Sequence, residues 1–310
     1  MNTALALRSG LATDTGRLRS ANEDRVYADD ARGIFLVVDG LGGHAAGELA
    51  AQTALDVIVH ELDTGEAGDP EQRIRRAITA ANNEIFHVAQ ARPECGGMAC
   101  VLTLAVVHDE TVTLGHVGDS RLYLIWNGTI KKLTSDHSPV GELEDQGELT
   151  EADAMAHPRR NEVFRDVGSR ERNAADSDFI EVKSFPFHPA AALLLASDGL
   201  SDALTSAEIA AIAETYNGDP GQTAECLVQA ANEHGGSDNI SVVLVAGPEF
   251  IGVNSPAMSD ARTRHAITRM RRGRARWKRV AGRSLWLVVG ILLGMVLLAV
   301  FERYAGGWRL

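Results

Sequence analysis

One stretch constrains the fold more than any other: five apolar residues, Ile34 to Val38, end in Asp39 and a glycine-rich bend. An apolar run of this length, rich in Val and Ile and stopped by glycines, predicts a buried strand. The strand would carry Asp39 to the edge of a sheet, and the glycines would let the backbone approach whatever the carboxylate holds. The ordinary alternative is a strand-to-helix turn in which Asp39 caps the next helix.

Three further aspartates, Asp119, Asp198 and Asp238, lie where an apolar run meets a loop, each beside Gly, Ser or Asn. Carboxylates at the ends of neighbouring strands can converge on one point, and clustered anions need a compensating cation. An all-oxygen donor set favours Mg²⁺ or Mn²⁺ over Zn²⁺. Several carboxylates around two such ions are typical of sites that attack a phosphoester. The alternative is that all four aspartates only form turns, because Asp-Gly is a common turn pair.

The charge distribution divides the chain in two. Residues 1–250 hold 18 Lys and Arg against 40 Asp and Glu, whereas residues 251–310 hold 12 against 2. An acidic body argues against nucleic acid as the main partner. The three cysteines lack metal-ligand spacing, which indicates small core residues in a reducing compartment. No apolar segment flanked by Lys or Arg opens the chain, so we expect no cleavable secretion signal.

Hydrophobic periodicity predicts alternating strands and helices over residues 1–250. Two consecutive amphipathic helices at 47–62 and 70–90 would cover one face of a sheet. Thr205 and Glu208 have the spacing of a capping box, and Asn127-Gly128 predicts a tight hairpin turn. Short connections indicate antiparallel pairing. The other expected elements are strands at 3–13, 26–28, 98–107, 111–117, 121–126, 179–185, 190–196 and 240–245, and helices at 150–156, 205–214 and 222–234.

Residues 135–177 change character, because they are polar and rich in Asp, Glu and Arg. A segment of this length with little core-forming pattern is usually a functional flap or a disordered insertion. His137 and His157 within it, and His116 before it, are expected to have structural roles.

Five ordered blocks across about residues 8–247 resemble the motifs of the bacterial metal-dependent protein serine/threonine phosphatases of type 2C, the PPM family. The blocks are Arg19 with Asn22-Glu23-Asp24, Val38 to His44, Gly118 to Arg121, Ser197 to Leu200 and Ser237 to Ile240. Leu133 to Ser138 and His157 to Asn161 resemble the flap of the same branch. The resemblance implies an α+β fold: a central sandwich of two antiparallel β-sheets flanked by helix pairs, with a flap insertion. It also implies two Mn²⁺ or Mg²⁺ ions in a cleft at one end of the sandwich.

The resemblance further implies a metal role for each strand-end aspartate. Asp39 would bridge the two ions, with the Gly40 carbonyl as another ligand. Asp198 and Asp238 would bind one ion directly. Asp119, together with Asp198, would form a third, weaker metal site.

Four residues outside that set also receive roles from the resemblance. Glu23 and Asp24 would act through metal-bound waters, and Arg19 would hold the substrate phosphate, which suits a bidentate guanidinium. A metal-activated hydroxide would be the nucleophile, without a phosphoenzyme. His44 corresponds to a general acid of the family. Its alternative is a histidine that caps or hydrogen-bonds near the helix start.

The C-terminal region predicts a membrane anchor. We expect a catalytic domain over 1–250, a basic juxtamembrane linker over 251–283, a transmembrane helix over 284–302 and a short tail over 303–310. Within the helix, the 17 residues from Leu285 to Phe301 carry no charge, a length of about 25 Å at 1.5 Å per residue. The basic flank predicts a single pass through the inner membrane with the catalytic domain in the cytoplasm. The alternatives are a buried core helix and a basic stretch that binds nucleic acid, although anionic lipid fits its position better.

With this resemblance, we expect a membrane-tethered enzyme that removes phosphate from serine and threonine of cytoplasmic proteins and opposes a serine/threonine kinase. One alternative is an inactive relative that serves as a phosphoprotein-binding scaffold. A second is an enzyme of the same fold dedicated to an anti-sigma-factor partner. A third is a metal-binding transporter accessory without catalysis.

Overall fold

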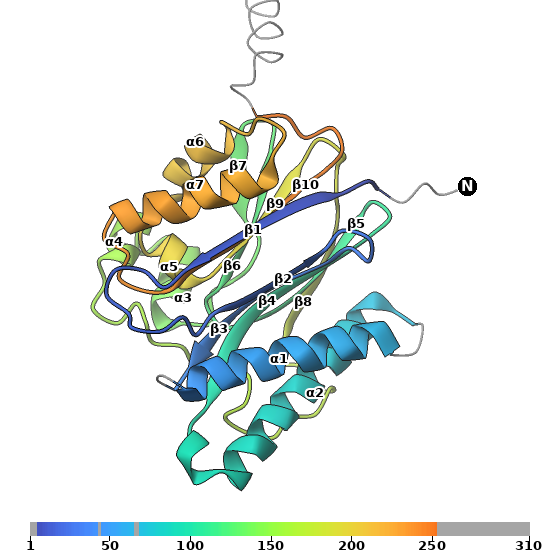
Figure 1. Ribbon diagram of the computed structural model, residues 1–310, viewed down its shortest axis with the longest axis vertical. Coiled ribbons are helices and arrows are strands. Elements are labelled where there is room, and N and C mark those ends of the chain that lie inside the picture. The colour runs from blue at the N-terminus through green and yellow to red at the C-terminus, as the bar shows by residue number, and fades with distance from the viewer. Residues whose placement is uncertain (1–4, 43–44, 65–67, 253–310) are drawn as a thin grey trace, which may run out of the picture. The chain divides into compact units, whose positions relative to one another are not determined.

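The computed structural model describes residues 5–42, 45–64 and 68–252, which form two five-stranded sheets (Figure 1). The strand orders are β1-β10-β9-β6-β7 and β2-β3-β4-β5-β8, and every neighbouring pair is antiparallel. The strands are β1 (Arg8–Asp14), β2 (Arg25–Asp29), β3 (Ile34–Leu41), β4 (Ala99–His108), β5 (Thr111–Val117), β6 (Arg121–Trp126), β7 (Thr129–Lys132), β8 (Glu181–Pro186), β9 (Ala192–Ala196) and β10 (Ile240–Ala246).

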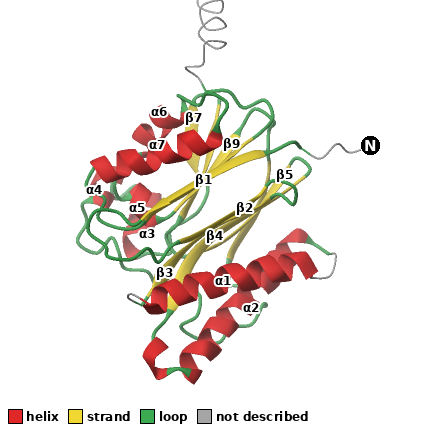
Figure 2. Ribbon diagram, viewed as in Figure 1, coloured by secondary structure: helices red, strands yellow, loops and turns green. Residues whose placement is uncertain are grey.

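Helices cover the outer face of each sheet (Figure 2). α1 (Ala45–Thr64) and α2 (Pro70–Ala91) pack against the β3-containing sheet, and α7 (Pro220–Glu233) packs against β1 and β10. Asp69 caps α2 by accepting a hydrogen bond from the Gln72 backbone, and Pro70 occupies its first turn. The remaining helices are η1 (Pro93–Cys95), α3 (Pro139–Asp145), α4 (Glu151–Met155), α5 (Asp198–Ser201) and α6 (Ser206–Ala213).

Alternate residues of β3 enter two different cores. Leu36 and Val38 pack with the buried faces of α1 and α2, whereas Phe35 and Val37 pack between the two sheets. Successive side chains of a strand point to opposite faces, so a strand buried on both faces is apolar at every position. β3 is apolar in this way from Ile34 to Val38. The layers are therefore helix, sheet, sheet, helix, which confirms the predicted sandwich flanked by helices.

Several local predictions are also confirmed. Thr205 and Glu208 form the capping box of α6. Asn127 and Gly128 have φ values of 52° and 72° in the β6–β7 hairpin, the left-handed conformations that its tight turn requires. The first strand begins at Arg8, later than the predicted residue 3.

The flap region differs from the sequence prediction because part of it is buried. The buried part follows β7. Four side chains there are each at most 5% exposed: Thr134, Asp136, His137 and Ser138. The short helix α3, which was not predicted, begins after Ser138, whose side chain accepts a hydrogen bond from the Gly141 backbone. Because the buried residues here are polar, hydrophobic periodicity could not predict that this segment packs into the interior.

No helix within 5–42, 45–64 and 68–252 is long and apolar enough to cross a membrane. The predicted linker, transmembrane helix and tail, which begin at residue 251, lie almost entirely outside the described residues.

Candidate metal centre

The sandwich brings the four predicted aspartates to one pocket. Asp39 lies near the end of β3 and Asp119 between β5 and β6, whereas Asp198 begins α5 two residues after β9 and Asp238 lies two residues before β10. All four line a pocket of about 200 Å³. The described residues that complete its lining are Arg19, Glu23, Gly40, Leu41, Gly42, Asn161, Val163 and Asn239.

Burial and mutual repulsion hold these carboxyls in an unfavourable state. Burial raises the pKa of Asp39 well above its usual range, and the charges of Asp24 and Asp198 raise it further. The pKa of Asp198 is raised in the same way, by burial and then by Asp119. Burial raises the pKa of Asp119 to about 7 and that of Asp24 to about 6. Each shift means that the surroundings disfavour the charged form.

Unpartnered oxygens mark the places where a cation fits. Within the described part of the chain, neither carboxylate oxygen of Asp24 has a hydrogen-bond partner, and Asp198 Oδ1 also lacks one. Arg19 is the only cation among the described lining residues, and its Nη2 lies 2.6 Å from Asp238 Oδ2. One guanidinium cannot balance so many carboxylates. The donor set is entirely oxygen, which fits hard divalent cations such as Mn²⁺ and Mg²⁺.

Asn239 holds the loop that carries Arg19 and Glu23. Its side-chain amide donates to the carbonyls of Thr15 and Ala21, both at 2.9 Å. Its Oδ1 accepts from the Glu23 backbone at 2.8 Å. Asn239 is 6% exposed, so these three bonds are protected from water. The loop is thereby fastened beside β10, which places Arg19 at the mouth of the pocket.

Glycine is required where β3 meets the first turn of α1. A Cβ on Gly40 would lie 2.3 Å from the Gly47 carbonyl oxygen. A Cβ on Gly47 would lie 2.0 Å from Glu23 Oε2. This close approach brings the Gly40 backbone and the Glu23 carboxylate to the same pocket. The glycines here allow close packing of β3 against α1 and Glu23; an approach of this backbone to a group held by Asp39 stays a prediction.

Two predicted residues have different outcomes. Asp24 does not line the pocket, yet it raises the pKa of both Asp39 and Asp198, so it belongs to the same charge cluster. His44 lies outside the described residues, and its role stays a prediction.

Sequence reasoning missed two residues of this region. Asp202 follows Asp198 by one helical turn, and its charge raises the pKa of Asp119 and Asp198. Arg160 of the flap pairs with Asp202 at 2.8 Å. The i, i+4 spacing of the two aspartates was a signal, but α5 has only four residues and was not predicted.

Comparison with known proteins agrees with this geometry. Residues 13–146 match the model of the family described as protein phosphatase 2C. The chain is 36% identical over 244 residues to a serine/threonine phosphatase, stp, of Listeria welshimeri, covering 75% of this chain and 93% of the relative. It is 34% identical over 242 residues to the protein phosphatase PhpP of Streptococcus pneumoniae, covering 76% and 96%.

Solved structures show the same fold. The serine/threonine phosphatase PstP/Ppp of Mycobacterium tuberculosis has a TM-score of 0.70 and 31% identity, over 78% of this chain and 99% of that one. The catalytic domain of PstP in complex with 2 manganese ions has a TM-score of 0.69 and 30% identity, over 78% and 99%. The chain belongs to the protein phosphatase 2C family and is a bacterial-type, metal-dependent protein serine/threonine phosphatase that uses Mn²⁺ or Mg²⁺.

Proposed function

We propose that the pocket at the strand ends is the binuclear centre of this phosphatase. Asp39 would bridge two divalent cations, the Gly40 carbonyl would be a further ligand, and Asp198 and Asp238 would bind directly. Asp119 with Asp198 would form the third, weaker site. The observation that carries this assignment is the set of buried carboxyls with raised pKa values and unpartnered oxygens.

The cations supply two effects when bound: they lower the pKa of a water molecule that attacks phosphorus, and they neutralise charge on the phosphoryl oxygens. The chain's own residues do the rest. Glu23 and Asp24 would orient water through hydrogen bonds. Arg19 would bind two phosphate oxygens, and its 50% exposed side chain at the pocket mouth suits that contact. Asp238, which pairs with Arg19 here, would keep the guanidinium directed toward the pocket.

We propose His44 as the group that protonates the leaving serine or threonine oxygen. It follows Gly42-Gly43 in sequence, directly before α1, and so is close along the chain to the Asp39 end of β3. An imidazole can serve this role because its pKa lies near neutral pH.

Counting bound Mn²⁺ tests the metal assignment. We expect calorimetric titration of the full chain to show two tight sites and a weaker third. Asp39→Asn should lose the paired binding, because an amide oxygen is a poor bridge between two cations. Two tight sites retained in Asp39→Asn would overturn the bridging role. Glu225, on α7 outside the pocket lining, gives a matched charge-removal control as Glu225→Gln.

We also propose that the C-terminal region anchors the enzyme to the inner membrane, with the catalytic domain in the cytoplasm. Support comes from sequence alone: ten Lys and Arg in 251–283 and then the 17 uncharged residues from Leu285 to Phe301. Deleting 284–310 should move the protein from the membrane pellet to the supernatant without a change in turnover. A full-length protein found in the supernatant would overturn the proposal.

The enzyme acts on phosphorylated proteins, and we propose that it opposes a serine/threonine kinase in the cytoplasm. Comparison of phosphoserine and phosphothreonine content in cells with and without the enzyme tests this. Phosphosites that rise on its loss and fall again when a kinase is removed support the pairing. Phosphosites that do not change would contradict it.

A further inference from the structure

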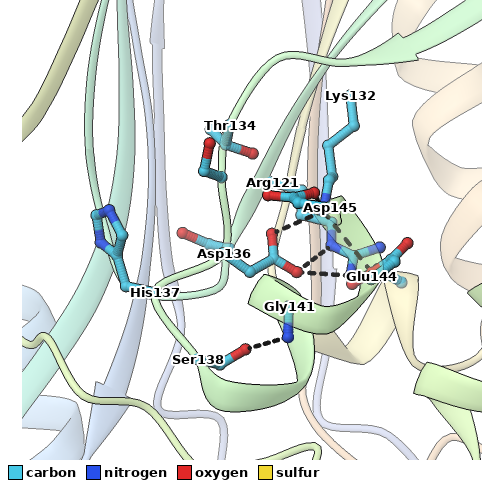
Figure 3. A network of polar contacts seen from close by, with 12 residues as sticks. Arg121, Lys132, Thr134, Asp136, His137, Ser138, Gly141, Glu144 and Asp145 are labelled. Carbon is cyan, nitrogen blue, oxygen red and sulfur yellow. Dashed lines mark hydrogen bonds and ion pairs between the residues drawn. The ribbon is translucent and has the colours of Figure 1, made fainter. Parts of the chain in front are cut away.

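The loop that carries Asp119 is held by two consecutive residues of the flap region, Asp136 and His137. Figure 3 shows their side chains pointing in opposite directions from the chain between β7 and α3. Asp136 Oδ2 accepts hydrogen bonds from Nε and Nη2 of Arg121 at 2.9 and 2.6 Å. On the other side, the His137 backbone N–H donates to the Gly118 carbonyl at 2.7 Å. The Gly118 N–H donates in turn to His137 Nδ1 at 3.0 Å. The residues on both sides of Asp119 are therefore attached to this one dipeptide.

Gly118 fits this attachment because of its backbone conformation. Its φ is +109°, and a Cβ there would lie 2.2 Å from Val101. His137 satisfies both the N–H and the carbonyl of this buried glycine, neither of which could be left unpaired without a penalty. Thr103 Oγ1 holds the next part of the loop by donating to the Ser120 carbonyl at 3.1 Å. The Asp119 side chain is what remains directed toward the pocket.

The Arg121 side continues into an ion network on α3. Arg121 Nη2 also contacts Glu144 at 2.9 Å, and Lys132 contacts Asp145 at 2.9 Å (Figure 3). The side chains of Arg121 and Asp136 are only 11% and 4% exposed. Removing one partner of a buried pair leaves an uncompensated charge. The network therefore fixes α3 and Asp136 against the start of β6, two residues after Asp119.

The His137 side continues into the flap wall of the pocket. The Phe164 backbone N–H donates to the His137 carbonyl at 2.9 Å, and Arg165 Nη1 lies 3.1 Å from His137 Nε2. Asn161 and Val163, three residues and one residue before Phe164, line the metal pocket. His137 is thus a shared attachment point for Asp119 and for the flap residues that face it.

A metal ion at this place is the competing explanation, because ligand atoms of His116, His137 and Glu181 lie within 4.8 Å of one another. The groups around His137 and Glu181 argue against a metal ion there. Both ring nitrogens of His137 face hydrogen-bond donors, because the Gly118 N–H lies 3.0 Å from Nδ1 and Arg165 Nη1 lies 3.1 Å from Nε2, so neither nitrogen is open to a cation. Lys183 already pairs with Glu181, and the Arg165 guanidinium adds a second positive charge. Burial lowers the pKa of His137 to about 3, which keeps the imidazole uncharged at neutral pH.

We propose that Asp136 and His137 are positioning residues that hold Asp119 in place for cation binding and couple it to the flap. This inference rests on the proposed metal role of Asp119. Groups that orient a metal ligand through hydrogen bonds typically change metal affinity by about 10–100-fold when removed. The effect should fall on the weaker Mn²⁺ site to which Asp119 contributes, and the tight sites should be unchanged.

Calorimetric Mn²⁺ titration of the full chain, without substrate, tests the proposal separately from phosphatase activity. We expect Asp136→Asn and His137→Leu to weaken the weaker site by about 10–100-fold. His137→Asn should recover part of the loss, because its Oδ1 can replace Nδ1 as acceptor. Asp145→Asn is the matched control: its partner Lys132 also lies 3.5 Å from Asp136 Oδ1, but the substitution leaves the Arg121–Asp136 and Gly118–His137 contacts in place. It should bind Mn²⁺ as the wild type does.

Double mutants with Asp119→Asn decide whether the effect acts through Asp119. If it does, adding His137→Leu to Asp119→Asn should cause no further loss of Mn²⁺ affinity, because the coupled groups act as a unit. Melting temperatures identify any variant that fails to fold. If His137→Leu does not fold, the Mn²⁺ affinities of His137→Asn and Asp136→Asn test the proposal instead. Wild-type Mn²⁺ affinity in the folded Asp136 and His137 variants, or additive losses of Mn²⁺ affinity in the double mutants, would overturn the inference. If Asp119→Asn alone leaves Mn²⁺ binding unchanged, the proposed role of Asp119 fails instead, and the inference fails with it.

Discussion

Replacing Asp24 by Asn should stabilise the metal-free protein. Asp24 is 2% exposed, and within the described residues neither of its carboxylate oxygens has a hydrogen-bond partner. Burial raises the pKa of Asp24 from 3.8 to about 6 and outweighs the hydroxyls of Ser241 and Ser197, which lower it. A shift of this size corresponds to about 3 kcal/mol of unfolding free energy, at about 1.4 kcal/mol per pKa unit. The isosteric amide removes the charge and with it the penalty.

The sign of the pH dependence follows from the direction of the shift. Because the folded state holds the Asp24 proton more tightly than the unfolded state, folding is not penalised below pH 3.8. The penalty grows between pH 3.8 and about 6 and is complete above that range. The stability gain of Asp24→Asn should therefore be full at about pH 8 and roughly half as large at about pH 5.

Urea unfolding in EDTA at both pH values measures this gain. Asp29→Asn is the control of opposite sign, because hydrogen bonds from Arg32 lower the pKa of Asp29 and its charge is favourable. Added Mn²⁺ should reverse the order, since it binds the wild-type cluster more tightly and stabilises the folded state by mass action. If Asp24→Asn does not raise the unfolding free energy at pH 8, or raises it equally at pH 5, the argument that Asp24 carries an uncompensated buried charge in the metal-free protein is refuted.

Three further substitutions test the centre. Asp198→Asn should lower turnover more than about 100-fold with the fold intact, because it removes a direct ligand; steady-state kinetics and circular dichroism check this. Gly47→Ala should lower kcat/KM about 10-fold by displacing Glu23, whose Oε2 would lie 2.0 Å from the new Cβ. Asn239→Ala should cost about 2–3 kcal/mol in urea unfolding through three lost hydrogen bonds, and should raise KM because the Arg19 loop is released.

The fold was predictable wherever burial follows a simple period. Ile34 to Val38 is apolar throughout because its two faces enter two different cores, and the helix pair after it carries a clear amphipathic pattern. Strand-end aspartates beside Gly, Ser or Asn predicted the pocket because antiparallel strands of one sandwich bring their ends together. The ordered motifs, through their resemblance to the phosphatase family, predicted that the pocket binds Mn²⁺ or Mg²⁺.

The flap was not predictable in the same way because polar contacts hold it. Asp136 and His137 are buried by hydrogen bonds to Arg121 and Gly118, partners 15 and 19 residues away, and no periodic pattern records such pairing. Asn239 is similar, since its role depends on the loop at Thr15 to Glu23, more than 200 residues earlier in the chain. Sequence spacing indicates which residues carry chemistry, but it does not indicate which residues hold them in place.

Hydrolysis of a phosphothreonine peptide by the purified full chain, with and without Mn²⁺, tests the central claim most directly. The wild type should release phosphate only when Mn²⁺ is present, and folded Asp39→Asn should release almost none under either condition. Release of phosphate in EDTA, or Mn²⁺-dependent release by Asp39→Asn at the wild-type rate, would contradict a catalytic centre built on the carboxylates at these strand ends.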